Sequence, residues 1–480
     1  MKTNTNITFY FLALIMSVAA AGARPNIIVL FADDLGYGEL SCQGNPEIPT
    51  PHIDSIAKNG VRFTAGYVAG PNCSPSRAGL LTGRTPTRFG YEFNPTGPLN
   101  EEPGFGLPAG EITIAEALHD GGYTTGLIGK WHQGGTAKFH PFRHGFDEFF
   151  GFTHEGHYFV SPPWDGVETL LRRKTLPGGG KGTWTGKKGL SYHTLLNSNE
   201  PDYDANNPIV RGGQPVEETE YLTDALTREA VDFIDRHDDK PFFLYLAYNA
   251  PHFPIQPPDD WIARVKKREP HLTELRAINV AFVEHLDHHL GRVIDAVGSA
   301  GIDEETIIVF SSDNGGSIPH GALNTPWRGG KQDHWEGGIR VPTCVVWPGQ
   351  IPVKRSDVPG MTMDFFPTLG RIAGVDIDHQ IDGQDLSSVW LENGSGDPDR
   401  TMIWVRREGG NRFQGRAYYA IRQGPWKLTQ NTSFEPMQLV NLEEDPYEKN
   451  PLPAQGPIAN KLISQLRLHI QEAGQVPWQP

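Results

Sequence analysis

The sequence predicts an α/β protein in which a large, mostly parallel sheet is sandwiched by helices, followed by a smaller antiparallel sheet with one helix. Three observations predict this fold. Short apolar runs rich in Ile, Val, Leu and Phe alternate with segments of helical periodicity. Four of these runs end in polar residues. After about residue 375 the pattern changes to short strands and a final helix.

Each of the four apolar runs is followed directly by side chains that carry chemistry. The runs are NIIVLFA before Asp33 and Asp34, TTGLIG before Lys130 and His132, FFLYLAYNAP before His252, and TIIVFSS before Asp313 and Asn314. In open α/β sheets, ligands bind beyond the carboxyl ends of the strands. We therefore expect all four polar sets to face one crevice.

The helical candidates lie between these runs and show apolar residues at three- and four-residue spacing. They are HIDSIAKNG closing at Gly60, TIAEALHDGG closing at Gly121, TDALTREAVDFIDRH, and ELRAINVAFVEHLDHHLGRVIDAVGSAG. Residues 152–217 show no clear period and are rich in Gly, Pro, Trp and Lys. So long an irregular segment is predicted to form a functional surface at the rim of the site rather than part of the core.

The chain is longer than a domain with a single hydrophobic core usually is. We therefore expect it to divide into a catalytic α/β domain over residues 24–375 and an α+β subdomain over residues 376–480. The short strands of the second part are MIWVRRE, AYYAIRQG, WKLTQN and MQLVNL, with a helix near residues 459–473.

The first 23 residues have the pattern of a signal peptide. Lys2 precedes the apolar run ITFYFLALIMSVAA, which ends at the small residues AGA. The run is shorter than the roughly 20 apolar residues that span a bilayer. We expect a cleaved signal, export to a periplasm or to the outside, and no membrane anchor.

Composition and charge exclude one class of partner. With 38% hydrophobic and 21% charged residues, the chain is of an ordinary globular kind. Its net charge of −15 argues against a general nucleic-acid binder. An anionic substrate stays compatible with this charge, since a local site can be positive on an acidic protein.

Three cysteines are an odd number for an exported protein. We interpret Cys42 and Cys344 as buried and inert, with a mutual disulfide as the alternative. Cys73 stands in PNCSPSRAGLLTG, where Ser74 is a good helix N-cap, Pro75 a good first helical residue and Gly83 a good end. The helix dipole and Arg77 would lower the pKa of the thiol, or stabilise an anion bound to whatever the cysteine becomes.

Asp33, Asp34, Asp313 and Asn314 gather three carboxylates and one amide carbonyl at strand ends. Oxygen ligands suit a hard cation, and Ca²⁺ tolerates so flexible a set better than Mg²⁺ does. The alternative makes these residues helix caps or turn acids. Three close carboxylates repel one another, and a divalent cation relieves that repulsion.

Cys73-Ser74-Pro75-Ser76-Arg77 resembles the C-x-P-x-R signature of type I sulfatases, which belong to the alkaline phosphatase-like superfamily. The resemblance extends over about residues 25–445 in family order. The similar segments are PNIIVLFADDLGYGEL, GLIGKWHQG, GFDEFFGF, NAPHFP, VFSSDNGG, GGKQDHWEGGIRVP, DFFPTL and AIRQGPWKL.

The resemblance implies that a formylglycine-generating maturation enzyme oxidises Cys73 to formylglycine, whose hydrated form attacks the sulfur of a sulfate ester. Residue 73 would then join the four oxygen ligands at the metal. Arg77 would orient the diol.

The resemblance also implies roles for two lysines and two histidines. Lys130 and Lys331 would bind the sulfate oxygens. His252 would protonate the departing alcohol with help from Lys331, and His132 would remove a proton to expel sulfate. The alternatives are solvated surface lysines and structural histidines.

We interpret the substrate as a sulfated carbohydrate. A basic and aromatic set in the 152–217 segment could grip it through charge and ring stacking, and a plain solvated loop is the equally weighted alternative. The set is Arg172, Arg173, Lys174, Lys181, Lys187, Lys188, Trp164, Trp184 and Tyr192. His154 and His157 are further candidates to reach the substrate. No specificity is inferred from Gln332, Asp333 and His334.

Two other functions are compatible with the same motifs. A phosphonate or phosphate monoester hydrolase could use the same metal and diol on phosphorus. A non-catalytic polysaccharide-binding protein could have descended from a sulfatase, although the full set of catalytic residues argues against it.

Overall fold

The computed structural model describes residues 24–480 except 188, 196–197, 202, 204–205, 408–416, 433, 477–478 and 480. The predicted signal peptide, residues 1–23, lies outside the described residues. No described helix combines the length and the apolar character that crossing a bilayer requires.

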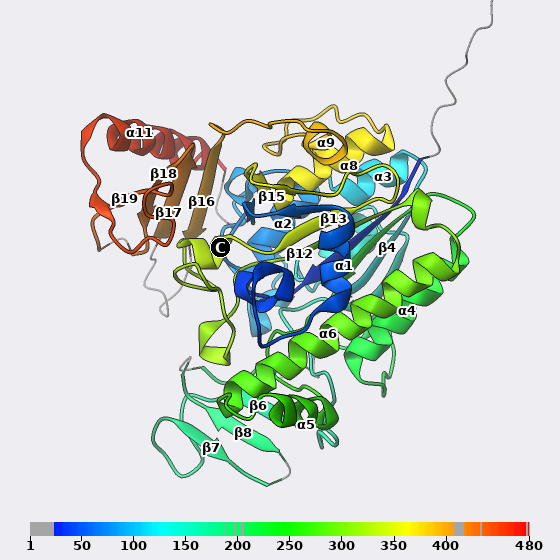
Figure 1. Ribbon diagram of the computed structural model, residues 1–480. Coiled ribbons are helices and arrows are strands. Elements are labelled where there is room, and N and C mark those ends of the chain that lie inside the picture. The colour runs from blue at the N-terminus through cyan, green and yellow to red at the C-terminus, as the bar shows by residue number, and fades with distance from the viewer. Residues whose placement is uncertain are drawn as a thin grey trace, which may run out of the picture.

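A large mixed sheet forms the centre of the molecule (Figure 1). Its strands are β1 (Asn26–Ala32), β2 (Val61–Phe63), β4 (Thr124–Lys130), β5 (Glu148–Phe152), β9 (Val210–Arg211), β10 (Gln214–Pro215), β11 (Phe242–Ala247), β12 (Thr306–Ser312), β13 (Thr343–Val346) and β14 (Lys354–Ser356). Among the described residues the strand order is β10-β9-β5-β4-β11-β1-β12-β13-β2-β14. The neighbours β5, β4, β11, β1 and β12 are all parallel, as predicted.

Helices cover both faces of this sheet. They are α1 (Pro51–Asn59), α2 (Cys73–Thr82), α3 (Ile114–Asp120), α4 (Leu222–Arg236), α5 (Asp259–Arg268), α6 (Glu274–Ser299), α7 (Glu336–Ile339), α8 (Phe365–Ala373) and α9 (Ser387–Leu391). Figure 1 shows α3, α8 and α9 above the sheet and α4, α5 and α6 below it.

Strand β1 explains why the central strands are continuously apolar. Ile28 and Leu30 pack into the core on the side of α4 and α6, whereas Ile27, Val29 and Phe31 pack into the core on the side of α2, α3 and α8. Each of these side chains is at most 1% exposed. Burial of one such side chain contributes roughly 1.5–3 kcal/mol, so a strand that is covered on both faces has no place for alternating polar residues.

Helix α2 begins two residues earlier than predicted. Its N-cap is Asn72, and Cys73 is the first helical residue. Ser74 does not cap the helix because its hydroxyl donates to the carbonyl of His132 at 2.6 Å and contacts the Tyr91 hydroxyl at 2.6 Å. The helix ends as predicted at Gly83, whose φ of 65° is the left-handed conformation that favours glycine.

The predicted C-terminal antiparallel sheet with its helix is confirmed. Its strands are β16 (Thr401–Arg407), β17 (Ala417–Gln423), β18 (Trp426–Gln430), β19 (Gln438–Asn441) and β20 (Leu452–Pro453). Helix α11 (Gly456–Ala473) covers them with Ala459, Leu462 and Leu466. The domain boundary at residues 375 and 376 stays a prediction.

The 152–217 segment contains more regular structure than its sequence indicates. Three short strands form a small sheet in the order β6-β8-β7, and they are β6 (Thr169–Arg172), β7 (Thr183–Thr185) and β8 (Leu190–His193). Strand β7 is exposed along its whole length, so no alternation of apolar and polar residues marks it. A further short pair joins β3 (Gly66–Tyr67) to β15 (Gly360–Met361).

All three cysteines are free thiols. The alternative of a disulfide between Cys42 and Cys344 is therefore wrong. Cys344 and Cys73 are buried, and Cys42 is half-buried.

Candidate active site

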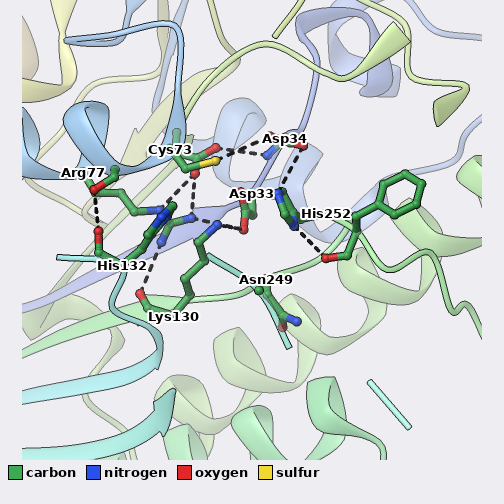
Figure 2. Close-up of polar contacts among 12 residues, drawn as sticks. Asp33, Asp34, Cys73, Arg77, Lys130, His132, Asn249 and His252 are labelled. Carbon is green, nitrogen blue, oxygen red and sulfur yellow. Dashed lines mark hydrogen bonds and ion pairs between the residues drawn. The ribbon is translucent and has the colours of Figure 1, made fainter. Parts of the chain in front are cut away.

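The four predicted polar sets meet at one edge of the sheet. Strands β4, β11, β1 and β12 are consecutive neighbours, and their register places Phe31 beside Ala247 and Ser311. The side chains that follow these strands therefore converge, and Figure 2 shows those of the first three strands together with Cys73 and Arg77.

The backbone turns sharply where two of these strands end. Asp34 has a φ of 65° and His132 a φ of 54°, in the left-handed region that non-glycine residues rarely adopt. The Asp33 amide donates to the carbonyl of Ala250 at 3.1 Å, and the Asp313 amide donates to the carbonyl of Ala32 at 3.2 Å. Strain of this kind, about 1–3 kcal/mol per residue, persists where the surroundings over-determine it, and it is concentrated at functional sites.

Asp33, Asp34, Asp313 and Asn314 form a compact set of oxygen atoms. The Asp34 amide donates to Asp313 Oδ1 at 3.0 Å, and Asn314 Nδ2 donates to Asp34 Oδ1 at 2.7 Å. Asp33 Oδ1 and Asn314 Oδ1 are buried and accept no hydrogen bond. Buried oxygens without donors fit a divalent cation, which would supply the missing partner.

Each carboxylate in this set is matched by one cationic side chain. Lys130 Nζ lies 2.6 Å from Asp33 Oδ2, and Lys331 Nζ lies 2.7 Å from Asp34 Oδ1. Arg77 Nη2 lies 2.8 Å from Asp313 Oδ2. Since the charges balance, a bound divalent cation would make the cluster positive, which suits an anionic substrate.

The pKa values of Asp33 and Asp313 shift in opposite directions. Burial, and then the charge of Asp313, raises the pKa of Asp33 to about 8 although Lys130 opposes the shift. Burial also raises the pKa of Asp313, but Arg77, Lys130 and Lys331 outweigh it and bring the pKa below its usual value. Close carboxylates share protons in this way until a cation binds.

Cys73 lies over the cluster at the start of α2. Its Sγ is 3.2 Å from Lys331 Nζ and 4.0 Å from Asp34 Oδ1, and the residue is fully buried. Burial raises the pKa of the thiol in spite of Lys130 and Lys331, and the nearby carboxylates add to the rise. The expectation of a lowered thiol pKa is therefore wrong, because desolvation outweighs the helix terminus and the cations.

Hydrogen bonds to carbonyl groups define the tautomers of both candidate histidines. A carbonyl only accepts, so His252 Nδ1 donates to the carbonyl of Phe253 at 2.7 Å and leaves Nε2 directed at Asp34 Oδ2, 3.8 Å away. His132 Nε2 donates to the carbonyl of Pro95 at 2.9 Å, and its buried Nδ1 has no hydrogen-bond partner. Burial, and then nearby lysine charges, lowers the pKa of both imidazoles well below the usual value.

Substrate access is limited to one side of the cluster. Asp33, Arg77 and Lys130 have fully buried side chains. The Lys331 side chain is 13% exposed and the His252 side chain 8% exposed. A substrate would therefore approach past Lys331 and His252.

Two amide side chains support the site and were not identified from the sequence. Gln133 Nε2 donates to the carbonyls of Ser74 and His132 at 2.8 Å each, which ties the start of α2 to β4. Asn249 is buried beside His252 (Figure 2), and its Oδ1 has no hydrogen-bond partner. Both stand inside quoted motifs, GKWHQG and NAPHFP, but a lone amide carries no periodic signal.

The rim beside His252 comes from the small β6-β8-β7 sheet. Leu170 bridges to Ile255, which follows His252 in the chain. Arg172 is not a surface residue: it pairs with Glu200 at 2.7 Å and lies over the ring of Phe253. His154 and His157 are also buried.

Most of the described members of the basic and aromatic set are exposed, and the exposed ones are Arg173, Lys174, Lys181, Trp184 and Lys187, whereas Trp164, Arg172 and Tyr192 are half-buried. Trp184 is 36% exposed and stacks on Tyr192 with ring centroids 5.4 Å apart. Arg173 lies 4.1 Å from the centroid of the same tyrosine ring. Lys188 lies outside the described residues.

Comparison with known proteins gives matches along almost the whole chain. A family model described as Sulfatase matches residues 25–375, and one described as N-sulphoglucosamine sulphohydrolase, C-terminal, matches residues 330–475. N-acetylgalactosamine-6-sulfatase of Canis lupus familiaris is 34% identical over 417 residues, which cover 83% of this chain and 73% of that protein. Arylsulfatase A of Homo sapiens is 33% identical over 467 residues, which cover 91% and 85%.

Solved structures of similar fold cover nearly the whole chain. The crystal structure of Ps i-CgsB in complex with k-i-k-neocarrahexaose matches with a TM-score of 0.81 and 33% identity, over 95% of this chain and 94% of that chain. The phosphonate monoester hydrolase of Agrobacterium radiobacter has a TM-score of 0.64 at 20% identity, over 94% and 96%, which is a likeness of fold alone.

Proposed function

Because this chain belongs to the sulfatase family, and is thus a sulfuric ester hydrolase, we propose that it is an exported enzyme that removes sulfate from a sulfated carbohydrate with a formylglycine made from Cys73 and a bound Ca²⁺. One observation carries the proposal. Cys73 Sγ lies within 4.0 Å of both Asp34 Oδ1 and Lys331 Nζ, beside buried oxygens that have no donor.

The metal would be held by Asp33, Asp34, Asp313 and Asn314, with residue 73 as a further ligand. This donor set contains oxygen atoms from three carboxylates and one amide, which Ca²⁺ prefers. When bound, the cation would lower the pKa of an oxygen on residue 73 and stabilise developing negative charge. Arg77 would keep Asp313 ionised and oriented, since it donates to Asp313 Oδ2 through both Nε and Nη2.

Residue 73, once converted to formylglycine, would supply the attacking oxygen at the position where Sγ now stands. Its place in the first turn of α2 is rigid, because Ser74 and Gln133 hold that turn against β4. A rigid attacking group needs little reorganisation on the way to the transition state.

Lys130 and Lys331 would hold the sulfate oxygens as negative charge shifts towards the leaving group. Both ammonium groups already lie within 3 Å of the carboxylates beside Cys73. Preorganised charges in a buried site are worth more than charges in water. The Lys331 ammonium keeps its proton firmly, since Asp34 raises its pKa in spite of burial.

His252 and His132 would move the protons. His252 presents Nε2 on the accessible side of the cluster, and this atom carries no proton while Nδ1 donates to the Phe253 carbonyl. Nε2 would first take up a proton from solvent, which the negative charge of a bound sulfate ester favours, and would then pass it to the departing alcohol. His132 presents a buried Nδ1 without a partner, which would accept a proton when residue 73 is regenerated.

The direct test is Cys73→Ala, with Cys42→Ala as the matched control because Cys42 is a half-buried thiol away from the site. We expect Cys73→Ala to lower kcat/KM on an aryl sulfate by at least about 10³-fold, as loss of a nucleophile does elsewhere. The control should keep its activity. Peptide mass spectrometry should find formylglycine at position 73 in active protein; full activity with an intact thiol there would refute the proposal.

The substrate is tested by a screen of sulfated oligosaccharides with chromatographic detection of desulfated products. Neocarra-oligosaccharides and N-acetylgalactosamine 6-sulfate come first, because a solved structure at 33% identity is a complex with k-i-k-neocarrahexaose and a relative at 34% identity is named N-acetylgalactosamine-6-sulfatase. Faster turnover of an aryl phosphate than of the matching aryl sulfate would overturn the proposal in favour of phosphorus chemistry. Sulfated sugars left unchanged by fully converted protein would also contradict it.

A further inference from the structure

A second cluster of metal-ligating side chains lies between two helices, apart from the sulfatase site. His285 and His289 of α6 meet Asp224 of α4, and the two helices pack side by side (Figure 1). The two Nε2 atoms are 3.1 Å apart. Asp224 Oδ2 lies 3.5 Å from His289 Nε2 and 3.8 Å from His285 Nε2.

Without a metal ion, hydrogen bonds do not satisfy all the ligand atoms of this cluster. The two histidines are four residues apart on one helix face, so their Nε2 atoms face each other, and a single proton can join them. Both side chains are at most 4% exposed, so water does not reach the Nε2 atoms to supply further partners.

The spacing of the three atoms matches a tetrahedral zinc site. Zinc binds imidazole nitrogen at about 2.0–2.1 Å and carboxylate oxygen at about 2.0–2.2 Å, so two ligand atoms at the tetrahedral angle lie roughly 3.3–3.5 Å apart. The observed separations of 3.1, 3.5 and 3.8 Å bracket that value. Two imidazoles with one carboxylate suit a divalent transition metal better than Ca²⁺.

We propose that Asp224, His285 and His289 bind a zinc ion that joins α4 to α6. The fourth ligand comes from solvent, which reaches the cluster beside Asp224, whose side chain is 32% exposed. The ion stabilises the helix layer below the sheet and takes no part in sulfate hydrolysis.

The position of Arg292 opposes the metal. Its Nη1 lies 3.7 Å from Asp224 Oδ1 and 3.4 Å from His289 Nδ1. The Arg292 side chain is 42% exposed, so it can turn into solvent when the ion binds. The rings of Tyr221 and Trp261 contact the ring of His285, and the ring of His288 contacts that of His289, so these rings form walls of the site.

The test is a zinc titration of the chelator-treated full chain in excess Ca²⁺, which keeps the sulfatase site filled. Competition with a chromophoric chelator measures the affinity, and the visible absorption of bound Co²⁺ reports tetrahedral geometry. We expect one zinc ion per chain, and a loss of affinity of about 100-fold or more in Asp224→Asn and in His289→Gln, since even outer-shell changes weaken metal binding 10- to 100-fold.

The matched control is His271→Gln, which removes a histidine that is 70% exposed just before α6, and this variant should bind zinc like the unchanged chain. Asp224→Asn is isosteric and partly exposed, so it should fold; circular dichroism checks this, and added zinc should raise the melting temperature of the unchanged chain but not of this variant. The proposal is wrong if the unchanged chain takes up no zinc in excess Ca²⁺, or if Asp224→Asn and His289→Gln bind it as tightly as His271→Gln does.

Discussion

Replacing Lys427 with methionine should destabilise the protein much more than the same change at the exposed Lys461 of α11, because Lys427 is completely buried between two carboxylates. Lys427 lies on β18, and its Nζ is 2.8 Å from Glu336 Oε1 and 2.9 Å from Glu448 Oε1. Glu336 is the first residue of α7, close in the chain to Lys331. The network therefore ties the C-terminal sheet to the segment that carries a proposed sulfate-binding lysine.

The magnitude follows from the charges that the change leaves behind. Removal of one partner of a buried ion pair costs about 3–5 kcal/mol, because the other charge stays desolvated. Glu336 would keep Arg340 at 3.2 Å, whereas the Oε1 atom of Glu448 would lose its cation. We therefore expect Lys427→Met to lower the free energy of unfolding by about 3–5 kcal/mol, and added Glu448→Gln to recover part of this loss.

The loss should depend on pH through Glu336. Burial raises the pKa of this carboxyl, but Lys427 and then Arg340 outweigh it and lower the pKa to about 2. In the unchanged chain its contribution is complete above the ordinary value of 4.5 and disappears as the pH falls towards 2. Glu448 adds to this dependence, since burial already raises its pKa to about 7 although Lys427 opposes the shift. Without Lys427 the pKa of both carboxyls moves upward, so the folded variant takes up protons more readily and the destabilisation should be smaller at pH 5 than at pH 7.5.

Urea unfolding at both pH values, followed by tryptophan fluorescence, measures these differences. The control is Lys461→Met, an exposed lysine on α11, which should change the stability by less than about 0.5 kcal/mol. Equal stability of Lys427→Met and Lys461→Met at pH 7.5 would refute the reasoning, as would a Lys427→Met loss that grows on acidification to pH 5.

Three further outcomes are expected. Thr113→Ala should lower the free energy of unfolding by about 1–2 kcal/mol in urea, because Thr113 and Glu116 form a capping box at the start of α3; an unchanged urea midpoint would contradict this. Trp184→Ala should raise KM about 2- to 10-fold for a sulfated oligosaccharide, since Trp184 lies on the exposed rim. The KM for an aryl sulfate should not change. Equal effects on both substrates would exclude a role of Trp184 in sugar binding. Chelation should abolish activity and lower the melting temperature, because a ligand that binds only the folded state stabilises it by about 2.7 kcal/mol at 100 times its Kd. Ca²⁺ should restore both the activity and the melting temperature at lower concentration than Mg²⁺ does. Full activity after chelation would argue against the metal.

The parts of the fold that were predicted well share one physical cause. Strands β1, β4, β11 and β12 are covered on both faces, so their sequences are continuous apolar runs that end where the sheet ends. For that reason the sequence alone places Asp33, Asp313 and His252 at one edge of the sheet. The family motifs then brought Cys73 and Lys331 to the same edge.

The parts that were missed depend on partners far away in the chain. Strand β7 is exposed on both faces, so nothing in its sequence distinguishes it from a loop. Arg172 was assigned to a solvent-facing set, but Glu200 and Phe253 enclose it. The pair His285 and His289 is visible as a spacing of four on a helix, whereas its third member, Asp224, belongs to another helix.

The sequence by itself determined the order of the elements, the helix layers on the sheet, and the set of oxygen, thiol, ammonium and imidazole groups at the strand ends. Only the tertiary structure decided which charges pair, which are buried, and therefore how they titrate. Cys73 shows the difference: its neighbours in the chain favour a reactive thiolate, yet burial under Lys331 and beside Asp34 raises the pKa of the thiol. Desolvation depends on every group packed around an atom, and most of those groups come from distant parts of the sequence.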